Sequence, residues 1–371
     1  MASRVTIGFP RMNKESGEKR VFLPAFIQYL TQFADIYLEE GYGSRSGFTF
    51  DDYRQGNPAV YKTDRLRAFQ KDYVIVLRSP NEDEFSLIRR GACLISMLHY
   101  PTRPKRMQIL QELGINAISM DSVMDDRNVR LVENMHAVAW NGLETAFDLL
   151  ERDCPDLIRE GAPYNVVILG TGMVGKYAVD AATKLGNIER NNRHISLNGP
   201  GSVAICAGRN ISESPEQMER LFRQADILVD ATSRRDITVP VVPNEWIEWL
   251  PEHAVICDLA VDPYLLDNKP PVVRGVEGIP QGNLNKYAFA PTDADWDKTV
   301  PASIPSANRR AVVSCYSWPG IHPEACMEHY AHQLEPLMEV LLSKPYQSIS
   351  LSGGYFERAL ARAKLPEHAA D

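Results

Sequence analysis

The chain has 371 residues, which is typical of two or three domains, and its 44% hydrophobic and 24% charged residues are ordinary for a folded protein. A formal net charge of −8 and the lack of a long Lys/Arg run exclude a basic nucleic-acid-binding track. No run of 18 apolar residues exists to span a membrane. The beginning of the chain has no apolar signal segment, and none of its six cysteines forms a Cys-x-x-Cys pair. We therefore expect a soluble, cytoplasmic protein with reduced cysteines.

The first part of the chain alternates short apolar runs with helical patterns, which predicts a parallel sheet covered by helices. Residues 24–40 have helical spacing, but residues 35–38 also fit a strand, and periodicity does not separate the two. Residues 130–151 predict a long helix, in or near which we place a domain boundary. The other predicted elements here are strands at residues 5–8, 73–77, 93–98 and 116–119 and a helix at residues 105–113.

The second part of the chain continues the same alternation, so it predicts a second α/β domain. Residues 187–201 are polar and are expected to form a surface loop. Residues 307–342 have a helical pattern that breaks near Pro319 and Pro323. The remaining predicted elements are strands at residues 165–169, 203–207, 227–231 and 254–259 and helices at residues 176–185, 218–224 and 244–250.

A glycine-rich loop follows the strand at residues 165–169 and reads Gly170-Thr171-Gly172-Met173-Val174-Gly175. In a G-x-G-x-x-G loop between a strand and a helix, the first glycine permits a tight turn and the second lets the backbone approach a pyrophosphate. The third allows the helix to pack closely on the strand. The helix N-terminus offers N–H groups and a positive dipole end to the phosphates. Because the strand and the helix are both present, we predict that these six residues bind a dinucleotide.

The choice between NAD and NADP depends on the end of the second strand of such a domain. An acidic residue there binds the ribose 2′-hydroxyl of NAD, whereas an arginine suits the 2′-phosphate of NADP. The strand at residues 203–207 runs into Gly208 and Arg209, and no acid is present there. Glu189 has about the expected spacing but lies in a segment without a strand pattern. Arg209 therefore favours NADP, and an arginine in a solvent-facing loop is the alternative interpretation.

Several segments in order along most of the chain carry a further resemblance. They are Ile7-Gly8-Phe9-Pro10, Lys14-Glu15, Glu18-Lys19-Arg20-Val21-Phe22-Leu23-Pro24, residues 41–53, Leu98-His99 and Asp258-Leu259-Ala260-Val261-Asp262. Together they resemble the alanine dehydrogenase and pyridine nucleotide transhydrogenase family, which includes saccharopine and lysine dehydrogenases. The resemblance implies two Rossmann-like, doubly wound α/β domains with the site in a cleft between them. Residues 1–137 plus about 305–371 would form the substrate domain, and residues 138–304 the dinucleotide-binding domain.

The resemblance also implies roles for individual residues. Arg20 matches the family arginine that binds the substrate carboxylate, a task suited to a two-pronged guanidinium. His99 matches the catalytic acid/base, because imidazole exchanges protons near neutral pH. Asp262 matches the catalytic carboxylate near the nicotinamide, which orients the amine or water. Arg78 stands where the family has a lysine. Arginine does not release its proton, so if that lysine transfers a proton this protein does so otherwise, whereas if it binds the carboxylate Arg78 suits the substrate-binding role.

Other differences from the family pattern lie at His136 and Trp140, which are bulkier than the family's serine and glycine, and near residues 304–309. They leave the amino acid substrate open, but they bear less on the reaction class. Glu328, His329, His332 and Glu335 share a helical spacing, but a solvated helix face explains them better than a metal site, and no metal motif is present.

We therefore predict an NAD(P)-dependent oxidoreductase that acts on the C–N bond of an amino acid, deaminating it or forming it from a 2-oxo acid. One alternative is an opine- or saccharopine-type secondary-amine dehydrogenase. Another, of a different class, is a non-catalytic dinucleotide-binding or transhydrogenase-like subunit. A small amino acid or 2-oxo acid is the expected partner, together with further copies of the chain in a homo-oligomer. No nucleic acid, membrane or metal is expected.

Overall fold

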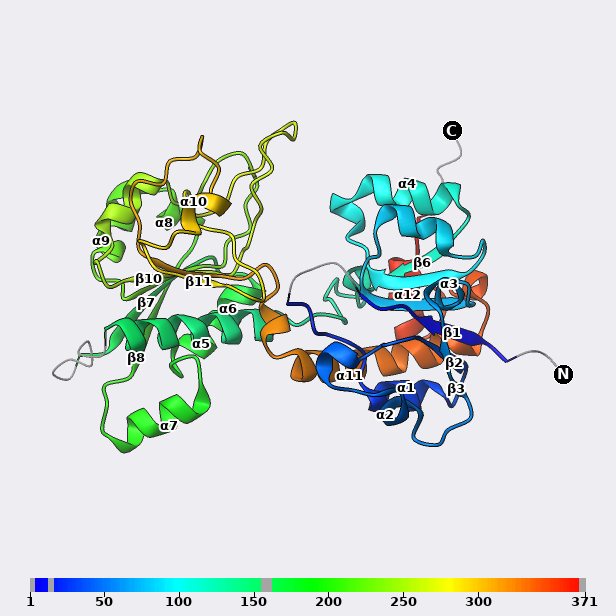
Figure 1. Ribbon diagram of the computed structural model, residues 1–371. Helices are drawn as coiled ribbons and strands as arrows, with labels where there is room; N and C mark the ends of the chain where they lie inside the picture. Colours follow the sequence, from blue (N-terminus) through cyan, green and yellow to red (C-terminus); the bar gives the residue numbers. More distant parts are fainter. Residues whose placement is uncertain (1–3, 13–16, 155–161, 367–371) are drawn as a thin grey trace. The chain divides into compact units, whose positions relative to one another are not determined.

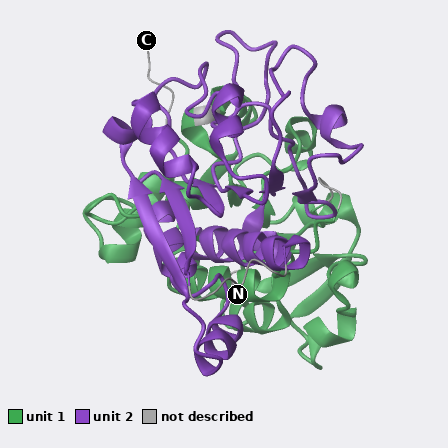
Figure 2. Cartoon of the chain, turned by 90° about the vertical axis from the view of Figure 1, so that its left-hand side faces the viewer, with its two compact units in different colours: residues 1–134, 322–371 green, residues 135–321 purple. Residues whose placement is uncertain are grey.

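The computed structural model describes residues 4–12, 17–154 and 162–366. Lys14 and Glu15, which contribute to the resemblance, lie outside these residues. The chain divides into two compact units (Figures 1 and 2): unit 1 is residues 1–134 with 322–371, and unit 2 is residues 135–321. The boundaries inferred from the sequence were 137/138 and about 304/305. No helix among the described residues is long and apolar enough to cross a membrane.

Unit 1 is built on a six-stranded parallel sheet in the order β3-β2-β1-β4-β5-β6. This is the doubly wound order, in which the connections reverse direction between β1 and β4. The strands are β1 (Thr6–Phe9), β2 (Asp35–Glu39), β3 (Val60–Thr63), β4 (Tyr73–Arg78), β5 (Cys93–Met97) and β6 (Asn116–Ser119). The helices are α1 (Pro24–Leu30), α2 (Phe50–Arg54), α3 (Arg65–Phe69), α4 (Pro104–Glu112), α11 (Pro323–Ser343) and α12 (Tyr355–Ala363).

Unit 2 contains a second six-stranded sheet, in the order β11-β12-β10-β9-β7-β8, with β11 as an antiparallel edge strand. Its strands are β7 (Tyr164–Leu169), β8 (Ser202–Ala207), β9 (Ile227–Asp230), β10 (Val255–Asp258), β11 (Ala288–Phe289) and β12 (Ala311–Ser314). Its helices are α5 (Met135–Asp153), α6 (Met173–Ala182), α7 (Ile188–Ser196), α8 (Arg209–Ser212), α9 (Pro215–Phe222) and α10 (Trp296–Thr299). The predicted fold class of two Rossmann-like α/β domains is confirmed.

Short 3₁₀ helices connect several of these elements. They are η1 (Ser44–Ser46), η2 (Glu82–Leu87), η3 (Tyr100–Thr102), η4 (Met120–Ser122), η6 (Asn244–Trp249), η7 (Trp318–Ile321) and η8 (Tyr346–Ser348).

Each unit has its own hydrophobic core. The central strands are buried on both faces, as in β4, where five consecutive residues from Tyr73 to Leu77 are buried. Such continuous apolar runs are typical of parallel strands covered by helices on both sides. In unit 1 the core takes in Met327 and Leu334 of α11, so this late helix packs with the first part of the chain. In unit 2, α5 contributes Leu143 and Phe147 to the core beneath β7.

Three local predictions were wrong. Residues 187–201 contain α7, because the Asn187 side chain accepts hydrogen bonds from the N–H groups of Glu189 and Arg190 and caps a helix there. Residues 311–314 form β12, which pairs with β10 in place of a helix. This pairing attaches the chain up to Ile321 to unit 2. The long helix predicted from residue 130 begins at Met135.

The open alternative at residues 35–38 is settled in favour of a strand, since β2 (Asp35–Glu39) pairs with both β1 and β3.

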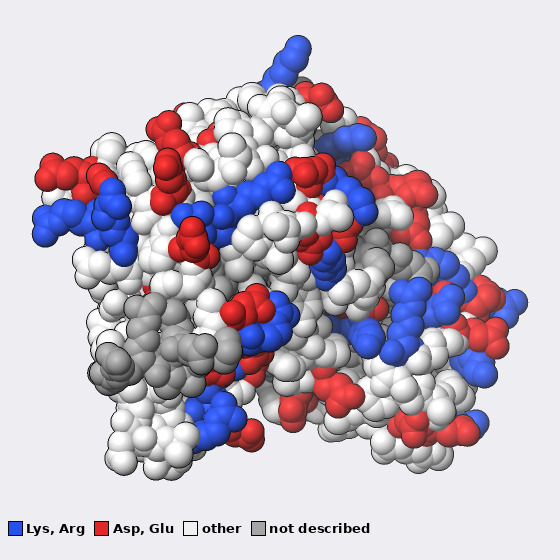
Figure 3. Space-filling model, turned by 60° about the vertical axis from the view of Figure 1, so that its left-hand side comes forward, with Lys and Arg blue, Asp and Glu red and all other residues white. Residues whose placement is uncertain are grey.

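On the face drawn in Figure 3, Lys and Arg side chains are interspersed with Asp and Glu.

Candidate functional site

The glycine loop joins β7 to α6 in unit 2. Gly170 has φ +101°, and a Cβ there would stand 2.4 Å from the Ala231 carbonyl oxygen, so a side chain is excluded. A Cβ at Gly175 would stand 2.2 Å from the Gly170 carbonyl oxygen, which shows how closely the helix approaches the strand. Gly172 differs, because no atom lies within 4 Å of the Cβ position. Its backbone therefore borders open space that a phosphate group can approach.

A cavity of about 600 Å³ lies at this loop, and its size is that of a typical small-molecule site. Its walls follow the carboxyl ends of β7, β8 and β9, where the strand order of the sheet reverses. Doubly wound sheets bind their ligands at this place. The lining includes Gly170, Thr171, Gly172, Gly208, Arg209, Ser212, Glu213, Thr232, Ser233, Arg234, Arg235 and Trp246. The geometry of the loop and the size of the cavity fit a dinucleotide.

Arg209 follows β8 and lines the cavity, as a residue near the adenosine ribose would. It is exposed, and its Nη2 lies 3.4 Å from the Ser233 carbonyl oxygen. Glu189, which has the spacing of a ribose-binding acid, lies on α7 and is not among the residues that line the cavity. An acid does reach the cavity in Glu213, which follows α8.

Arg20 of unit 1 lies between β1 and α1 and is only 6% exposed. Its Nε and Nη2 donate to the two carboxylate oxygens of Glu18 at 2.9 and 2.6 Å. Burial acts to raise the pKa of Glu18, but the Arg20 guanidinium, with a contribution from the charge of Arg78, holds this pKa below its usual value. Arg20, Arg78 and Glu18 therefore form one electrostatic group, with Glu18 ionised.

Arg78 ends β4 and lines a small cavity of about 40 Å³. Arg11 and Arg65 line the same cavity, and both contact Glu39 in ion pairs. Since β1 and β4 are adjacent parallel strands, the segments that follow them lie at one edge of the sheet. The structure thus places Arg78 beside two arginines that are already paired with Glu39.

His99 follows β5 at the same carboxyl edge and has an unusual left-handed backbone, with φ +54°. The backbone N–H of His99 donates to Oδ1 of Asp121 at 3.1 Å, and the ring Nδ1 of His99 lies 3.2 Å from Oδ2 of the same carboxylate. The Ser119 hydroxyl also donates to Asp121, at 2.8 Å. Burial acts to raise the pKa of Asp121, but its hydrogen bonds and the charge of His99 hold that pKa below its usual value.

Asp121 thus orients the imidazole of His99 through Nδ1, while 55% of the His99 side chain remains exposed. A carboxylate on one ring nitrogen fixes the tautomer and directs the other nitrogen outward. This arrangement suits an acid/base group.

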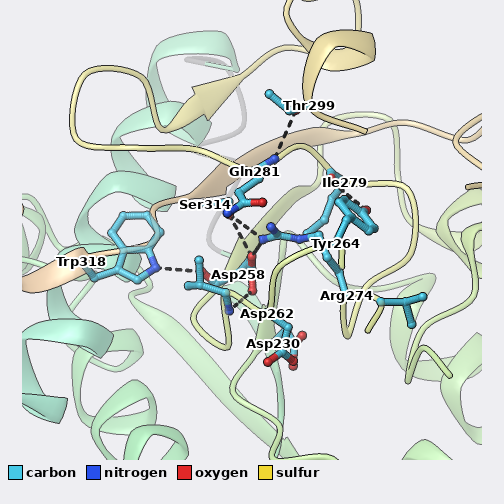
Figure 4. Close-up of polar contacts among 12 residues, drawn as sticks. Asp230, Asp258, Asp262, Tyr264, Arg274, Ile279, Gln281, Thr299, Ser314 and Trp318 are labelled. Carbon is cyan, nitrogen blue, oxygen red and sulfur yellow. Dashed lines mark hydrogen bonds and ion pairs between the residues drawn. The ribbon is translucent and has the colours of Figure 1, made fainter. Parts of the chain in front are cut away.

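Asp262 lies just beyond β10 in unit 2, on a segment held by the buried Asp258 (Figure 4). Oδ1 of Asp258 accepts a hydrogen bond from the N–H of Val261 at 2.9 Å. Val261 has φ +52°, a strained conformation for a β-branched residue. Oδ2 of Asp258 accepts from Ser314 at 2.8 Å and pairs with Arg274. Strain adjacent to Asp262 supports the prediction that this aspartate has a functional role.

Asp230 ends β9 directly opposite Asp258 of β10, so two buried carboxyl groups stand side by side. Its Oδ1 accepts from the N–H and the hydroxyl of Thr232, a cavity residue, whereas its Oδ2 has no hydrogen-bond partner among the described residues. Burial, followed by the charge of Asp258, raises the pKa of Asp230 to about 6. Folding therefore favours the protonated form of this group.

We expect Asp230→Asn to stabilise the protein at pH 8 by on the order of 1–3 kcal/mol and to have little effect at pH 4. A raised pKa means that the native state binds more protons than the unfolded state between about pH 4 and pH 6. The contribution of Asp230 to the free energy of unfolding is then lost as the pH rises through this window. The asparagine side chain of the variant does not ionise, so the variant does not lose this stability. Urea unfolding at both pH values measures the difference, with the exposed Asp267→Asn as control. An equal effect of Asp230→Asn at both pH values would contradict the expectation.

Sequence reasoning did not single out Glu18, Asp121 or Arg234. Glu18 has a signal in the sequence, whereas the pairing of Asp121 with His99 follows from the strand order. Glu18 belongs to the same E-x-R segment as Arg20, and Asp121 follows β6 next to the end of β5, where His99 lies. Arg234 carries no signal in the sequence, because its partner Asp262 is 28 residues away.

Comparisons with known proteins show which family and which relatives this chain is similar to. The family described as Alanine dehydrogenase/PNT, N-terminal domain, matches residues 9–139. Alanine dehydrogenase of Bacillus subtilis (strain 168) is 23% identical over 273 residues, which cover 69% of this chain and 70% of the relative. Alanine dehydrogenase 2 of Staphylococcus aureus (strain USA300) is 24% identical over 274 residues, covering 69% and 72%.

Solved structures agree on the fold. An L-alanine dehydrogenase superposes with a TM-score of 0.69 at 20% identity, covering 97% of this chain and 94% of that one. A transhydrogenase from Sinorhizobium meliloti superposes with a TM-score of 0.61 at 15% identity, covering 96% and 97%. The predicted family resemblance is confirmed.

Proposed function

Since the chain is an alanine dehydrogenase-like oxidoreductase, we propose that it exchanges hydride between a nicotinamide dinucleotide and the amine-bearing carbon of an amino acid. The observation that carries this proposal is the cavity of about 600 Å³ at the glycine loop, where Gly172 leaves room for a pyrophosphate. When bound, the nicotinamide accepts or returns the hydride. The protein positions the substrate and moves protons.

We propose the following residue roles, which the contacts around these side chains support. Arg20 and Arg78 bind the substrate carboxylate, and Glu18 holds the Arg20 guanidinium in place. His99, oriented by Asp121, takes the proton released as the amine becomes an imine and then assists the attack of water on the imine. Asp262 orients the amine or the water. The products are a 2-oxo acid and ammonia, and the reverse reaction is reductive amination.

A second candidate is a secondary-amine dehydrogenase, which joins an amino acid to a 2-oxo acid. The observation in its favour is that Arg78 lines a small cavity at the end of β4. The product of such a condensation carries at least two carboxylates. Arginine at position 78, where the family has a lysine, suits a carboxylate that is bound through two parallel hydrogen bonds.

The assay that tests the proposal follows nicotinamide absorbance with NADH and NADPH supplied separately. Purified protein is given 2-oxo acids with ammonia and, in parallel, 2-oxo acids with amino acids as the amine. Turnover with ammonia supports a primary amino-acid dehydrogenase, and turnover only with amino acids supports the second candidate. Tight dinucleotide binding without turnover across both panels would contradict the enzymatic proposal and favour a binding role.

We propose that Arg209 selects NADP by contacting its 2′-phosphate. If so, Arg209→Ala is expected to lower the ratio of kcat/KM for NADPH over NADH by about tenfold, because one charge-assisted hydrogen bond is lost. Steady-state kinetics with both cofactors measure this ratio. The control is Arg223→Ala, which removes an exposed arginine of the same unit that pairs with Glu219. An unchanged ratio in Arg209→Ala would show that Arg209 is a solvent-facing loop residue.

A further inference from the structure

Arg234 belongs to the segment that follows β9 and lines the dinucleotide cavity. Although this segment is at the surface, the side chain of Arg234 turns inward and is only 4% exposed. A buried guanidinium is costly unless a carboxylate and hydrogen-bond acceptors surround it. The contacts of Arg234 therefore indicate what holds it in place.

Arg234 joins three separate segments of unit 2. Its Nη2 donates to Oδ2 of Asp262 at 2.7 Å and to the Val273 carbonyl oxygen at 2.5 Å. Its Nη1 donates to the Val239 carbonyl oxygen at 2.9 Å. Asp262 supplies the carboxylate of the pair, and its own side chain is 35% exposed. One side of Asp262 is thus fixed by Arg234, while part of its surface stays open to solvent or ligand.

The backbone of Asp262 is fixed independently of Arg234. Asp258 accepts the N–H of Val261, and the Asp230 carbonyl oxygen accepts the N–H groups of Leu259 and Ala260 at 2.9 and 3.1 Å. These bonds set the path of the chain up to Asp262. They leave the direction of its carboxylate to be set by a side-chain contact, and Arg234 provides that contact.

We propose that Arg234 is a positioning residue that holds the carboxylate of Asp262 in its working orientation and ties it to the wall of the dinucleotide cavity. This inference rests on the proposed function, which gives Asp262 its role at the reacting amine or water. Arg234 acts through Asp262 and has no part in the chemistry. Lysine does not replace it fully, because a single ammonium group lacks the planar fork that reaches Asp262 and the two carbonyl oxygens together.

A double-mutant cycle tests this inference on kcat, with Arg234→Ala, Asp262→Asn and the combined variant. Arg234→Ala is expected to lower kcat by about tenfold through misplacement of the carboxylate. In the Asp262→Asn background the same change is expected to cost little, because the group that Arg234 positions is already absent. Arg234→Lys should recover part of the loss, and added guanidinium ion should partly restore Arg234→Ala. Circular dichroism and thermal unfolding confirm that each variant is folded, and Arg223→Ala serves as the surface control.

The outcomes separate the inference from the proposed function. In one outcome the wild-type protein turns over normally, and the kcat losses of the two single variants multiply in the combined variant. This outcome would overturn the positioning role and leave the proposed function intact. If Arg234→Ala does not fold, the cycle is measured with Arg234→Lys, where the same criterion applies. If the wild-type protein shows no turnover with any pair of substrates, the proposed function fails and the inference fails with it.

Discussion

Replacing His99 with alanine is expected to lower kcat by about 10²–10⁴-fold while dinucleotide affinity stays the same. His99 is the proposed acid/base, and its imidazole is oriented by Asp121 with the side chain 55% exposed. The dinucleotide cavity is lined by residues of unit 2, whereas His99 belongs to unit 1, so the change leaves the cavity intact. Steady-state kinetics give kcat, and fluorescence titration with the reduced dinucleotide gives its dissociation constant.

The control for this experiment is His332→Ala, which removes an exposed histidine of α11 in the same unit. It is expected to leave kcat unchanged. A His99→Ala protein with normal kcat would contradict the assignment of His99 as the acid/base. That result would favour direct transfer of the substrate's protons to and from water.

Gly172→Ala is expected to weaken dinucleotide binding by about a hundredfold while the protein remains folded. Nothing in the protein lies within 4 Å of the Cβ position, and the backbone at φ −73° accepts any L-residue. The new methyl group instead occupies the space through which the pyrophosphate approaches the backbone, and a steric cost of about 3 kcal/mol corresponds to that factor. Isothermal titration with the reduced dinucleotide measures the change.

Two other glycines provide matched comparisons. Gly354→Ala adds a methyl group at an equally open site in unit 1, and it should leave dinucleotide binding unchanged. Gly175→Ala should instead destabilise the fold, because its Cβ would meet the Gly170 carbonyl oxygen at 2.2 Å. Unaltered binding by Gly172→Ala would show that the pyrophosphate does not approach this loop.

Strands buried on both faces were the part of the fold most accessible from sequence. The strand predicted at residues 73–77 matches β4 (Tyr73–Arg78), because its continuous apolar run is typical of a parallel strand that is covered on both faces. The helix α7 was missed because a polar, exposed helix lacks an apolar stripe and depends on its Asn187 cap. The strand β12 was missed because residues 311–314 were assigned to a helical pattern that continues to residue 342.

The candidate site shows the same division between local and distant information. The glycine loop is a continuous motif, so the predicted loop lies at the cavity that the structure reveals. His99 was found as a single residue, but its partner Asp121 comes from the neighbouring strand and becomes visible only when the strand order is known. Arg234 shows the limit of sequence reasoning, since its contact with Asp262 depends on the folded path of two loops.

Transfer of a labelled hydride tests the central claim of the proposed function most directly. The protein is incubated with the oxidised dinucleotide and amino acids that carry deuterium on the α-carbon, and the reduced nicotinamide is examined by mass spectrometry and NMR. We predict that deuterium appears at C4 of the nicotinamide ring, with the matching 2-oxo acid as the second product. Reduced dinucleotide without deuterium, or no reduction with any amino acid or secondary amine in a protein that binds the dinucleotide, would contradict it.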